Sequence, residues 1–457
     1  MRFSSHSKRR SLAAAAAGAA LIAAGLTGCS GDGGSGDGGS ATSGEITWWS
    51  WTPDNNVAEA EIAAFNNDYP DIKVNYRKVP IDNYAAILRP ALASNDGPDV
   101  FSVNATGSFS AQTFAPYATD LTPAIEKLLG DDWKSKVFDG GTKAFTIDDR
   151  LVAGQWARVG AGIMWINKDT FDKYKVQPPK TYDDWVSVCK TFRDNGLGCF
   201  REGMAGSAGF IVDTMHSIVD SVEPHLWARA LAGEAKWNDP GFVEAFGILR
   251  KMQADGILDK GSVGYMQYPD VNNAFLSGDV PMVQMGTWYA QYAVKKNLAA
   301  ALEGAGETGG DQLVQVPIPF PDVAGKGNPS TIFSDVDAGH SVNAKSPNRN
   351  AATTFALWMG HTQKGQEAVV SNLDAVATLK GVSPDFDSID LVDPEVQRPE
   401  LEQLASALDE KLDPRYGTTL TAELSQAVID ASQAMVNGNR SPQDVANDLQ
   451  SVADSQG

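Results

Sequence analysis

Tryptophan and polar side chains lie at or just beyond the ends of two expected strands, where they could contact a ligand. Trp51 ends an apolar strand at 45–51 and Asp54 follows it, and Trp288 follows another strand at 281–285. Ligands of open α/β sheets bind beyond the carboxyl ends of the strands. An aromatic ring packs on the C–H face of a polyol, while carboxylates and amides pair with its hydroxyls. These residue types at these positions favour reversible binding of a neutral polyol.

Each of these positions also has a purely structural interpretation, which stays open. Trp51 could pack under the turn that follows it, and Trp288 could belong to a hydrophobic core. Asp54 could compensate the dipole of the next helix. Asn104, which follows a strand at 99–103, could bind the ligand or close an Asx-turn.

Strands and helices alternate in the first part of the chain. We expect strand, helix, strand, helix and strand at 45–51, 52–66, 72–77, 84–94 and 99–103, with Pro53 in the first turn of the first helix. Such an alternation predicts a parallel sheet with helices on both faces. Trp48 and Trp49 lie within the first strand, so we expect both of them in the core.

A second set of elements begins near residue 162. Three further strands are expected at 162–166, 281–285 and 331–343. Helices are expected at 181–195, 239–255, 271–276 and 350–359. Residues 399–452 contain three helical patches with helix-forming composition and no strand pattern.

The first 44 residues are typical of an exported, lipid-anchored protein. Four basic residues and no acid occur in the first ten positions, and 12–26 is an Ala-rich apolar run, which predicts a signal peptide at 1–28. The sequence LTGC ending at Cys29 resembles the bacterial lipobox, which implies acylation of Cys29. An ordinary cleaved signal with an incidental cysteine is the alternative. Residues 29–44, rich in Gly, Ser and Asp, would form a flexible tether.

Two cysteines remain, Cys189 and Cys199. Thr181 with Asp184 predicts a capped helix to about residue 195, in which Cys189 lies roughly 9 Å from the end. An extended return from Gly196 to Cys199 covers a similar distance. In an exported chain this favours a disulfide, and two buried thiols are the alternative.

The net charge of −20 argues against nucleic acid or an anionic membrane surface as a partner. About 410 residues follow the tether, which is enough for two domains. The sequence contains no HExxH, GxxxxGK[ST] or GxSxG, and its histidines lack metal-ligand spacing. We therefore predict a binding protein with no metal or cofactor. A glycosidase remains the alternative, because its two carboxylates can come from anywhere in a sequence.

Five segments in order along residues 45–378 together resemble one family. They are FNNDYPDIKVNY, LASNDGPDVFSV, GIMWINKDTFDKYKVQPPKTYDDW, FLSGDVPMVQMGTW and AGHSVNAKSPNRNAATTFALWM. The second contains a Gly-x-Pro-Asp-Val strand entry, and the fourth ends in a Gly-x-Trp block. The combination is similar to the extracellular solute-binding proteins of ABC importers, in the branch that contains the maltose-binding protein.

The resemblance implies the α/β, two-lobed fold of type II periplasmic binding proteins. Each lobe would be a mostly parallel sheet flanked by helices, and the chain would cross the hinge between lobes more than once. The first lobe would take 45–157 and 336–380, and the second 158–335 and 381–457. The ligand would lie in the cleft, and the lobes would close over it through contacts from both sides.

The resemblance also assigns candidate ligand-binding residues. Trp288 matches the tryptophan of the Gly-x-Trp block, which stacks on a pyranose ring in the family's sugar binders. Trp156 and Arg158 precede a hinge crossing, as a second stacking residue and a bidentate donor, although an interlobe ion pair is equally open for Arg158. Asp335 and Asp337 lie in the return crossing, where they would bind hydroxyls or stabilise the closed state.

The function that the resemblance implies is capture of a sugar, in the first place an oligosaccharide, and its delivery to a membrane permease. The protein would be a monomer, lipid-anchored to the outer face of the cytoplasmic membrane, and not an enzyme. A polyamine is the alternative ligand of the same fold, because Trp51, Asp54, Asp335 and Asp337 could supply aromatic rings and acids around an amine.

Overall fold

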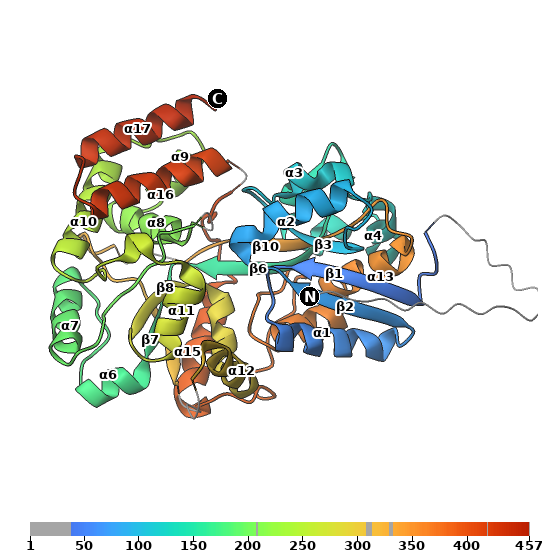
Figure 1. Ribbon diagram of the computed structural model, residues 1–457, viewed down its shortest axis with the longest axis horizontal. Helices are drawn as coiled ribbons and strands as arrows, with labels where there is room; N and C mark the ends of the chain where they lie inside the picture. Colours follow the sequence, from blue (N-terminus) through green and yellow to red (C-terminus); the bar gives the residue numbers. More distant parts are fainter. Residues whose placement is uncertain (1–37, 207–208, 308–312, 329–331, 418, 457) are drawn as a thin grey trace, which may run out of the picture. The chain divides into compact units, whose positions relative to one another are not determined.

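The computed structural model describes residues 38–206, 209–307, 313–328, 332–417 and 419–456 (Figure 1). They belong to one compact unit, Asp37–Gly457. The expected signal peptide, Cys29 and most of the expected tether lie outside the described residues. Among the described residues, no helix is both long enough and apolar enough to cross a membrane.

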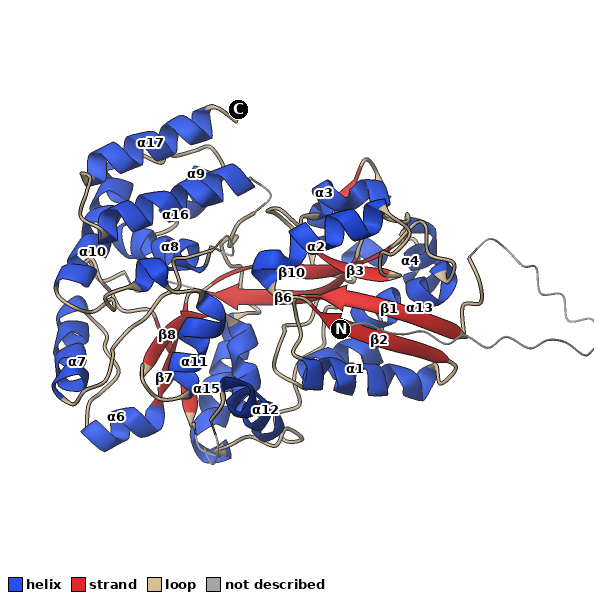
Figure 2. Ribbon diagram, in the orientation of Figure 1, coloured by secondary structure: helices blue, strands red, loops and turns tan. Residues whose placement is uncertain are grey.

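Five strands form the first sheet, in the order β2-β1-β3-β10-β6 (Figure 2). Their bounds are β1 (Gly44–Ser50), β2 (Ile72–Lys78), β3 (Val100–Asn104), β6 (Gly154–Ala161) and β10 (Phe333–Val342). β1 pairs in parallel with β2 and with β3, as the alternation of elements predicts. β10 pairs antiparallel with β3 and with β6, so the sheet is mixed. The expected all-parallel sheet becomes mixed because the chain leaves this sheet after β6, forms the second sheet, and then returns as β10 in the opposite direction.

Seven helices pack with the first sheet around one hydrophobic core. They are α1 (Asn55–Asp68), α2 (Ile81–Ala93), α3 (Ala111–Phe114), α4 (Thr122–Leu129), α5 (Asp139–Phe145), α13 (Arg349–His361) and α14 (Gln363–Val370). Trp48 is fully buried in this core. Trp49 is not, because it faces the other side of β1, where the Arg77 guanidinium lies 4.2 Å from its ring centroid. The expectation that both rings are core residues was wrong for Trp49.

The first helix begins later than the sequence indicated. α1 starts at Asn55, with Asp54 as its N-cap residue, so Pro53 precedes the helix instead of occupying its first turn. The carbonyl of Asp54 accepts from the backbone N–H groups of Val57 and Ala58. The Asp54 side chain is thereby left free of a capping role and pairs with Lys78.

A second sheet has three strands, in the order β8-β7-β9. They are β7 (Ile163–Asn167), β8 (Met282–Met285) and β9 (Gln315–Pro319). Both pairings are antiparallel, so the expectation of a mostly parallel sheet in each lobe was wrong here. Six α-helices separate β7 from β8, and the chain returns from this long excursion in the direction opposite to β7.

This sheet is buried on both faces, which explains the uninterrupted apolar run of β7. Met164 and Ile166 face one core, and Ile163 and Trp165 face another. The first of these cores takes the helices α6 (Lys168–Tyr174), α7 (Tyr182–Asp194), α8 (Phe210–Val222), α9 (Leu226–Leu231), α10 (Pro240–Ala254), α16 (Ala422–Val436) and α17 (Pro442–Asp454). The second takes α11 (Asn272–Leu276), α12 (Lys295–Ala305) and α15 (Pro394–Ala407). A short β4 (Thr146–Ile147) and β5 (Arg150–Leu151) hairpin completes the strands of the described residues.

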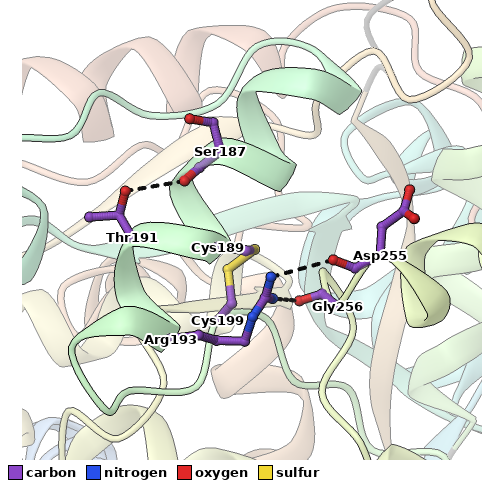
Figure 3. Close-up of a disulfide and its surroundings, with 7 residues drawn as sticks. All are labelled: Ser187, Cys189, Thr191, Arg193, Cys199, Asp255 and Gly256. Carbon is purple, nitrogen blue, oxygen red and sulfur yellow. Dashed lines mark hydrogen bonds between the residues drawn. A yellow bond between two sulfur atoms is a disulfide. The ribbon is translucent and has the colours of Figure 1, made fainter.

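A disulfide joins α7 to the loop after it. Cys189 and Cys199 are bonded, with their Cα atoms 5.1 Å apart, and both side chains are buried (Figure 3). The helix begins with the reciprocal capping box of Thr181 and Asp184 that the sequence predicts. Beside the disulfide, the Arg193 guanidinium donates to the carbonyl of Gly256, which fixes the end of α7 against the end of α10 (Figure 3).

The lobe limits drawn from the sequence remain predictions. The limits near residues 157 and 336 lie within β6 and β10, long strands that pair along most of their length. β6 is followed directly by β7 of the second sheet, with Gly162 between them in a left-handed conformation at φ +83°. A Cβ at Gly162 would lie 2.7 Å from the Phe333 ring, so this crossing has no room for a side chain.

Candidate functional site

A cavity of about 450 Å³ lies where residues of the first core meet residues of the second sheet and its helices. Its size falls in the range of roughly 300–1,000 Å³ that is usual for small-molecule sites. Three tryptophans and several ionisable groups contribute to its wall. The lining residues are Trp51, Thr52, Asp54, Lys78, Pro80, Ile81, Asp82, Trp156, Ala157, Val159, Phe210, Tyr268, Pro269, Trp288, Gln291, Tyr292, Asp337, Asp374, Ala375 and Arg415.

Trp51 enters the cavity from the segment that follows β1. Its ring packs against Tyr84 at 5.2 Å and Phe109 at 4.7 Å between centroids, which leaves it 8% exposed. Both interpretations of the sequence therefore apply to it, since it packs locally and also lines the cavity. Asp54 reaches the same wall and forms an ion pair with Lys78, which is also a lining residue.

Trp156 lies in β6 and also lines the cavity. Its ring stacks on His340 with centroids 5.3 Å apart, and burial lowers the pKa of that histidine to about 3, so His340 is a neutral support. Trp156 is only 1% exposed. Among the described residues, its Nε1–H finds no hydrogen-bond acceptor.

Trp288 lines the cavity from a 3₁₀ segment, Thr287–Ala293, that follows β8 and packs against a core of the second sheet. Its Nε1–H donates to Tyr268 Oη at 3.1 Å, which fixes the plane of the ring. The ring also folds back over Gly286, where a Cβ would lie 1.9 Å from Cζ3 of Trp288. The glycine of the Gly-x-Trp block is thus required by the position of the tryptophan.

Arg415 is held beside Trp288 by a fixed geometry. It is 6% exposed, and its guanidinium donates to both carboxylate oxygens of Asp213, Nε to Oδ1 at 2.9 Å and Nη2 to Oδ2 at 2.6 Å. Its Cζ lies 5.1 Å from the Trp288 ring centroid and 4.4 Å from that of Tyr416. Asp213 therefore neutralises the arginine, and the two rings hold its plane.

Asp374 and Gln291 form a buried polar pair in the wall. Gln291 Nε2 donates to Asp374 Oδ1 at 2.8 Å and to the carbonyl of Trp288 at 3.1 Å. Thr52 Oγ1 donates to Asp374 Oδ2 at 3.4 Å. Burial raises the pKa of Asp374 to about 8, and the negative charges of Asp54 and Asp337 add to the effect.

A comparison with protein families matches residues 48–364 to the family described as bacterial extracellular solute-binding protein. The chain belongs to this family. The expected fold class, an α/β architecture of the two-lobed kind, is thereby confirmed together with the comparisons of structure.

Individual relatives of this solute-binding protein are distant. An uncharacterised ABC transporter extracellular-binding protein of Pyrococcus horikoshii is 24% identical over 50% of this chain and 52% of its own length. The melibiose/raffinose/stachyose-binding protein of Bacillus subtilis is 27% identical over 30% of this chain and 29% of its own. The chain thus spans about half the length, or less, of these curated relatives.

The fold extends over a larger share of solved structures. A maltose-bound MalE3 of T. maritima matches with a TM-score of 0.68 at 18% identity, covering 90% of this chain and 100% of the other. At this identity the likeness shows the fold, and the site of this solute-binding protein has to be argued from its own residues.

Five of the ligand-binding residues predicted from the sequence line the cavity of the solute-binding protein: Trp51, Asp54, Trp156, Trp288 and Asp337. Asn104, Arg158 and Asp335 do not line it. Asn104 Oδ1 accepts from the backbone N–H of Thr106 at 3.4 Å, which is the Asx-turn alternative. Arg158 donates to the carbonyl of Leu408 at 2.9 Å and covers the Phe138 ring.

Asp335 and Asp337 point to different surroundings although they are two residues apart in β10. A shift in register between Val336 and Ala338 bulges the strand at that point. Asp335 accepts from the backbone N–H groups of Tyr416 at 2.6 Å and Gly417 at 2.8 Å, so it fixes the loop that carries Arg415. Asp337 lines the cavity, and burial raises its pKa while Arg415 opposes that shift.

The sequence reasoning missed Arg415, Gln291, Asp374 and Tyr268. Arg415 lies between α15 and α16, in a region that was assigned only helical character. No motif marks these four residues in the sequence. What distinguishes them from other residues of the same types is their burial and their hydrogen-bond partners, which only the structure shows. Within the described ranges, no group of three or more His, Cys, Asp or Glu has the arrangement of a metal site.

Proposed function

We propose that this chain captures a sugar, up to the size of a short oligosaccharide, and delivers it to the membrane permease of an ABC transporter. The observation that carries the proposal is the cavity of about 450 Å³ with Trp51, Trp156 and Trp288 in its wall. Aromatic faces take the C–H surfaces of pyranose rings, and the polar groups between them pair with hydroxyls. The family to which the chain belongs and the sugars named for its relatives support the same ligand class.

The proposal includes a lipid anchor at Cys29 and an extracytoplasmic location. An acyl chain on Cys29 would hold the folded unit at the membrane surface, near the permease. The protein binds and releases its ligand unchanged as a monomer, and it uses no cofactor.

Calorimetric titration of the folded unit with mono- and oligosaccharides, with spermidine as a comparison, tests the sugar proposal. We expect saturable binding of at least one saccharide, with the same saccharide recovered intact afterwards. Products accumulating in the solution would instead identify an enzyme. Binding of spermidine with no saccharide bound would favour the polyamine alternative, to which Asp54 and Asp337 lend support as acids beside aromatic rings.

The lipid anchor is tested separately in a bacterial host that processes lipoproteins. The full-length chain should incorporate labelled palmitate, and Cys29→Ser should abolish the incorporation while Cys189→Ser leaves it unchanged. Labelling that persists in Cys29→Ser would contradict the anchor.

A further inference from the structure

The cavity contains two largely buried carboxyl groups, Asp337 and Asp374, that no cation of the described residues approaches within hydrogen-bond distance. The two cations of its wall are already engaged, Lys78 with Asp54 and Arg415 with Asp213. Neither of these cations is therefore the main partner of Asp337 or Asp374. Buried carboxylates are normally paired with a cation, because removal from water is costly for an isolated charge.

Asp374 is the more deeply buried of the two, at 4% exposed. The hydrogen bonds recorded for it in the described part of the chain come from the neutral groups of Gln291 and Thr52. The cation nearest to Asp337 among the ion pairs of the described residues is Arg415. Its Nη1 lies 3.9 Å from Asp337 Oδ1, which is beyond hydrogen-bond distance. Both carboxylates line the same cavity, so a ligand that enters it meets them together.

A second observation, an unpartnered oxygen of Gln291, also points to a ligand. Gln291 is 5% exposed. Its amide nitrogen donates one hydrogen bond to Asp374 and one to the Trp288 carbonyl. These contacts set the orientation of the amide, and within the described residues its Oε1 has no donor. An acceptor buried in the wall without a partner favours a ligand that donates hydrogen bonds.

Trp156 adds the opposite requirement. Its buried Nε1–H needs an acceptor, which the described residues do not supply. An ammonium group has donors only, whereas a sugar hydroxyl or ring oxygen accepts. A simple polyamine therefore satisfies Asp337, Asp374 and Gln291 but not Trp156, and a neutral sugar leaves the two carboxylates without a cation.

We propose that the preferred ligand is a carbohydrate that carries a protonated amine, with its ammonium bound by Asp337 and Asp374 and its oxygens reached by Trp156. The inference rests on the proposed function and narrows its ligand class. Stacking on Trp51 and Trp288 supplies the contact with the sugar rings, and the ammonium pairs with Asp374 once that carboxyl group has released its proton to solvent on binding.

Matched saccharides that differ in one substituent test the inference by calorimetry. Suitable sets are glucose with glucosamine, galactose with galactosamine, and cellotriose with its fully 2-amino and 2-acetamido counterparts. We expect the amine to bind at least tenfold more tightly than its hydroxyl or acetamido partner. Equal or tighter binding of the neutral partners overturns the inference and leaves the proposed function standing.

Two variants connect the preference to the carboxylates. Asp337→Asn and Asp374→Asn keep the shape of each side chain, and each should reduce the preference for the amine by about tenfold or more. The matched control is Asp390→Asn, which removes an exposed carboxylate paired with Lys295 outside the cavity and should leave the preference unchanged. An undiminished preference in both cavity variants overturns the assignment of the ammonium to these residues.

Titration with spermidine distinguishes a polyamine from an aminated saccharide as the source of the bound ammonium group. Tight binding of spermidine with no binding of any saccharide, aminated or neutral, would contradict both the inference and the proposed function. If no aminated saccharide binds while a neutral saccharide does, only the inference fails.

Discussion

Asp374 illustrates how a binding cavity is built at the expense of stability. Its carboxylate is almost fully buried, and it orients Gln291, which in turn contacts the carbonyl of Trp288. One acid therefore links the segment of Thr52, next to Trp51, to the segment that carries Trp288. The same burial makes the ionised form of Asp374 costly in the folded protein without ligand.

Asp374→Asn should make the ligand-free protein more stable, and more so as the pH rises. The pKa of Asp374 is about 8 in the folded state, against an ordinary value of 3.8. Between these values the folded state holds a proton that the unfolded state has lost, so rising pH favours unfolding of the parent protein. The variant lacks this titration, and its advantage should grow by at most about tenfold in the folding equilibrium constant per pH unit.

Urea unfolding followed by tryptophan fluorescence at several pH values between 4 and 9 measures this difference. The advantage of Asp374→Asn should rise up to about pH 8 and then level off. Asp390→Asn, an exposed carboxylate outside the cavity, is the matched control and should show no such rise. A pH-independent difference for Asp374→Asn would show that this carboxylate is not held protonated.

Trp288→Ala should abolish most of the affinity for the sugar with little effect on the thermal midpoint. The ring is only partly buried and faces the cavity, so its loss removes a stacking surface more than it removes core packing. Loss of an aromatic anchor worth roughly 2 kcal/mol lowers affinity by about 30-fold. Titration calorimetry and thermal unfolding together measure both effects.

Trp49→Ala is the matched control for Trp288→Ala. It also removes a partly buried tryptophan in contact with an arginine, but it lies outside the cavity. Its affinity should equal that of the parent. A fall in midpoint of Trp288→Ala well beyond that of Trp49→Ala would make Trp288 a core residue.

The position of a residue at the end of a strand did not by itself predict its place in the cavity, because Asn104 ends β3 and does not line it. Trp51, Trp288 and Asp54 follow their strands and line the cavity, as does Asp337 within β10. Asp335 has the same type and the same strand as Asp337, but the bulge between them gives Asp335 a backbone-binding role. A register shift of this kind depends on the partner strand, so the local sequence does not reveal it.

At the scale of elements, local rules located the elements they named to within a few residues, but they missed others, such as β6, β9, α8 and α12, and gave the wrong strand direction in the second sheet. The capping box at Thr181 and the apolar run of β7 are determined within a few residues, and both occur where expected. The antiparallel pairing of β7 with β8 and β9 is determined by the path of long intervening segments. Arg415 escaped prediction for the same reason, because its partner Asp213 lies about 200 residues away in the sequence.

The turn between β8 and the Trp288 segment leads to a prediction about Gly286. Its backbone, at φ −107°, is open to any residue, so a substitution there acts through space alone. A Cβ would meet the Trp288 ring at 1.9 Å and the carbonyl oxygen of Gly160 at 2.5 Å. Gly286→Ala should therefore displace the ring, lowering both affinity and thermal midpoint.

Gly247→Ala is the control for Gly286→Ala. Gly247 lies inside α10, where a Cβ meets no atom within 4 Å, so alanine should stabilise the helix by about 1 kcal/mol and leave binding unchanged. Crystal structures or tryptophan fluorescence of the Gly286 variant would report the displaced ring directly. Unchanged affinity in Gly286→Ala would mean that Trp288 does not need its present position to bind.

At the scale of the whole folded unit, the cavity draws its walls from separate cores. Trp51 and Trp156 belong to the core of the first sheet, and Trp288 and Tyr268 pack against a core of the second. β6 runs from the first sheet directly toward β7 of the second, and β10 returns beside it. A ligand that contacts both walls therefore favours the arrangement in which the walls are closest.

Binding should make the protein more compact in solution. Small-angle X-ray scattering of the folded unit at saturating saccharide should give a smaller radius of gyration than the ligand-free protein gives. Trp288→Ala at the same saccharide concentration should keep the ligand-free value, because it lacks the contact on one wall. An unchanged radius in the parent protein, under conditions where calorimetry reports saturation, would mean that the ligand binds one wall alone. In that case, the pairing of Trp51 and Trp156 with Trp288 across the cavity would not be what holds the sugar.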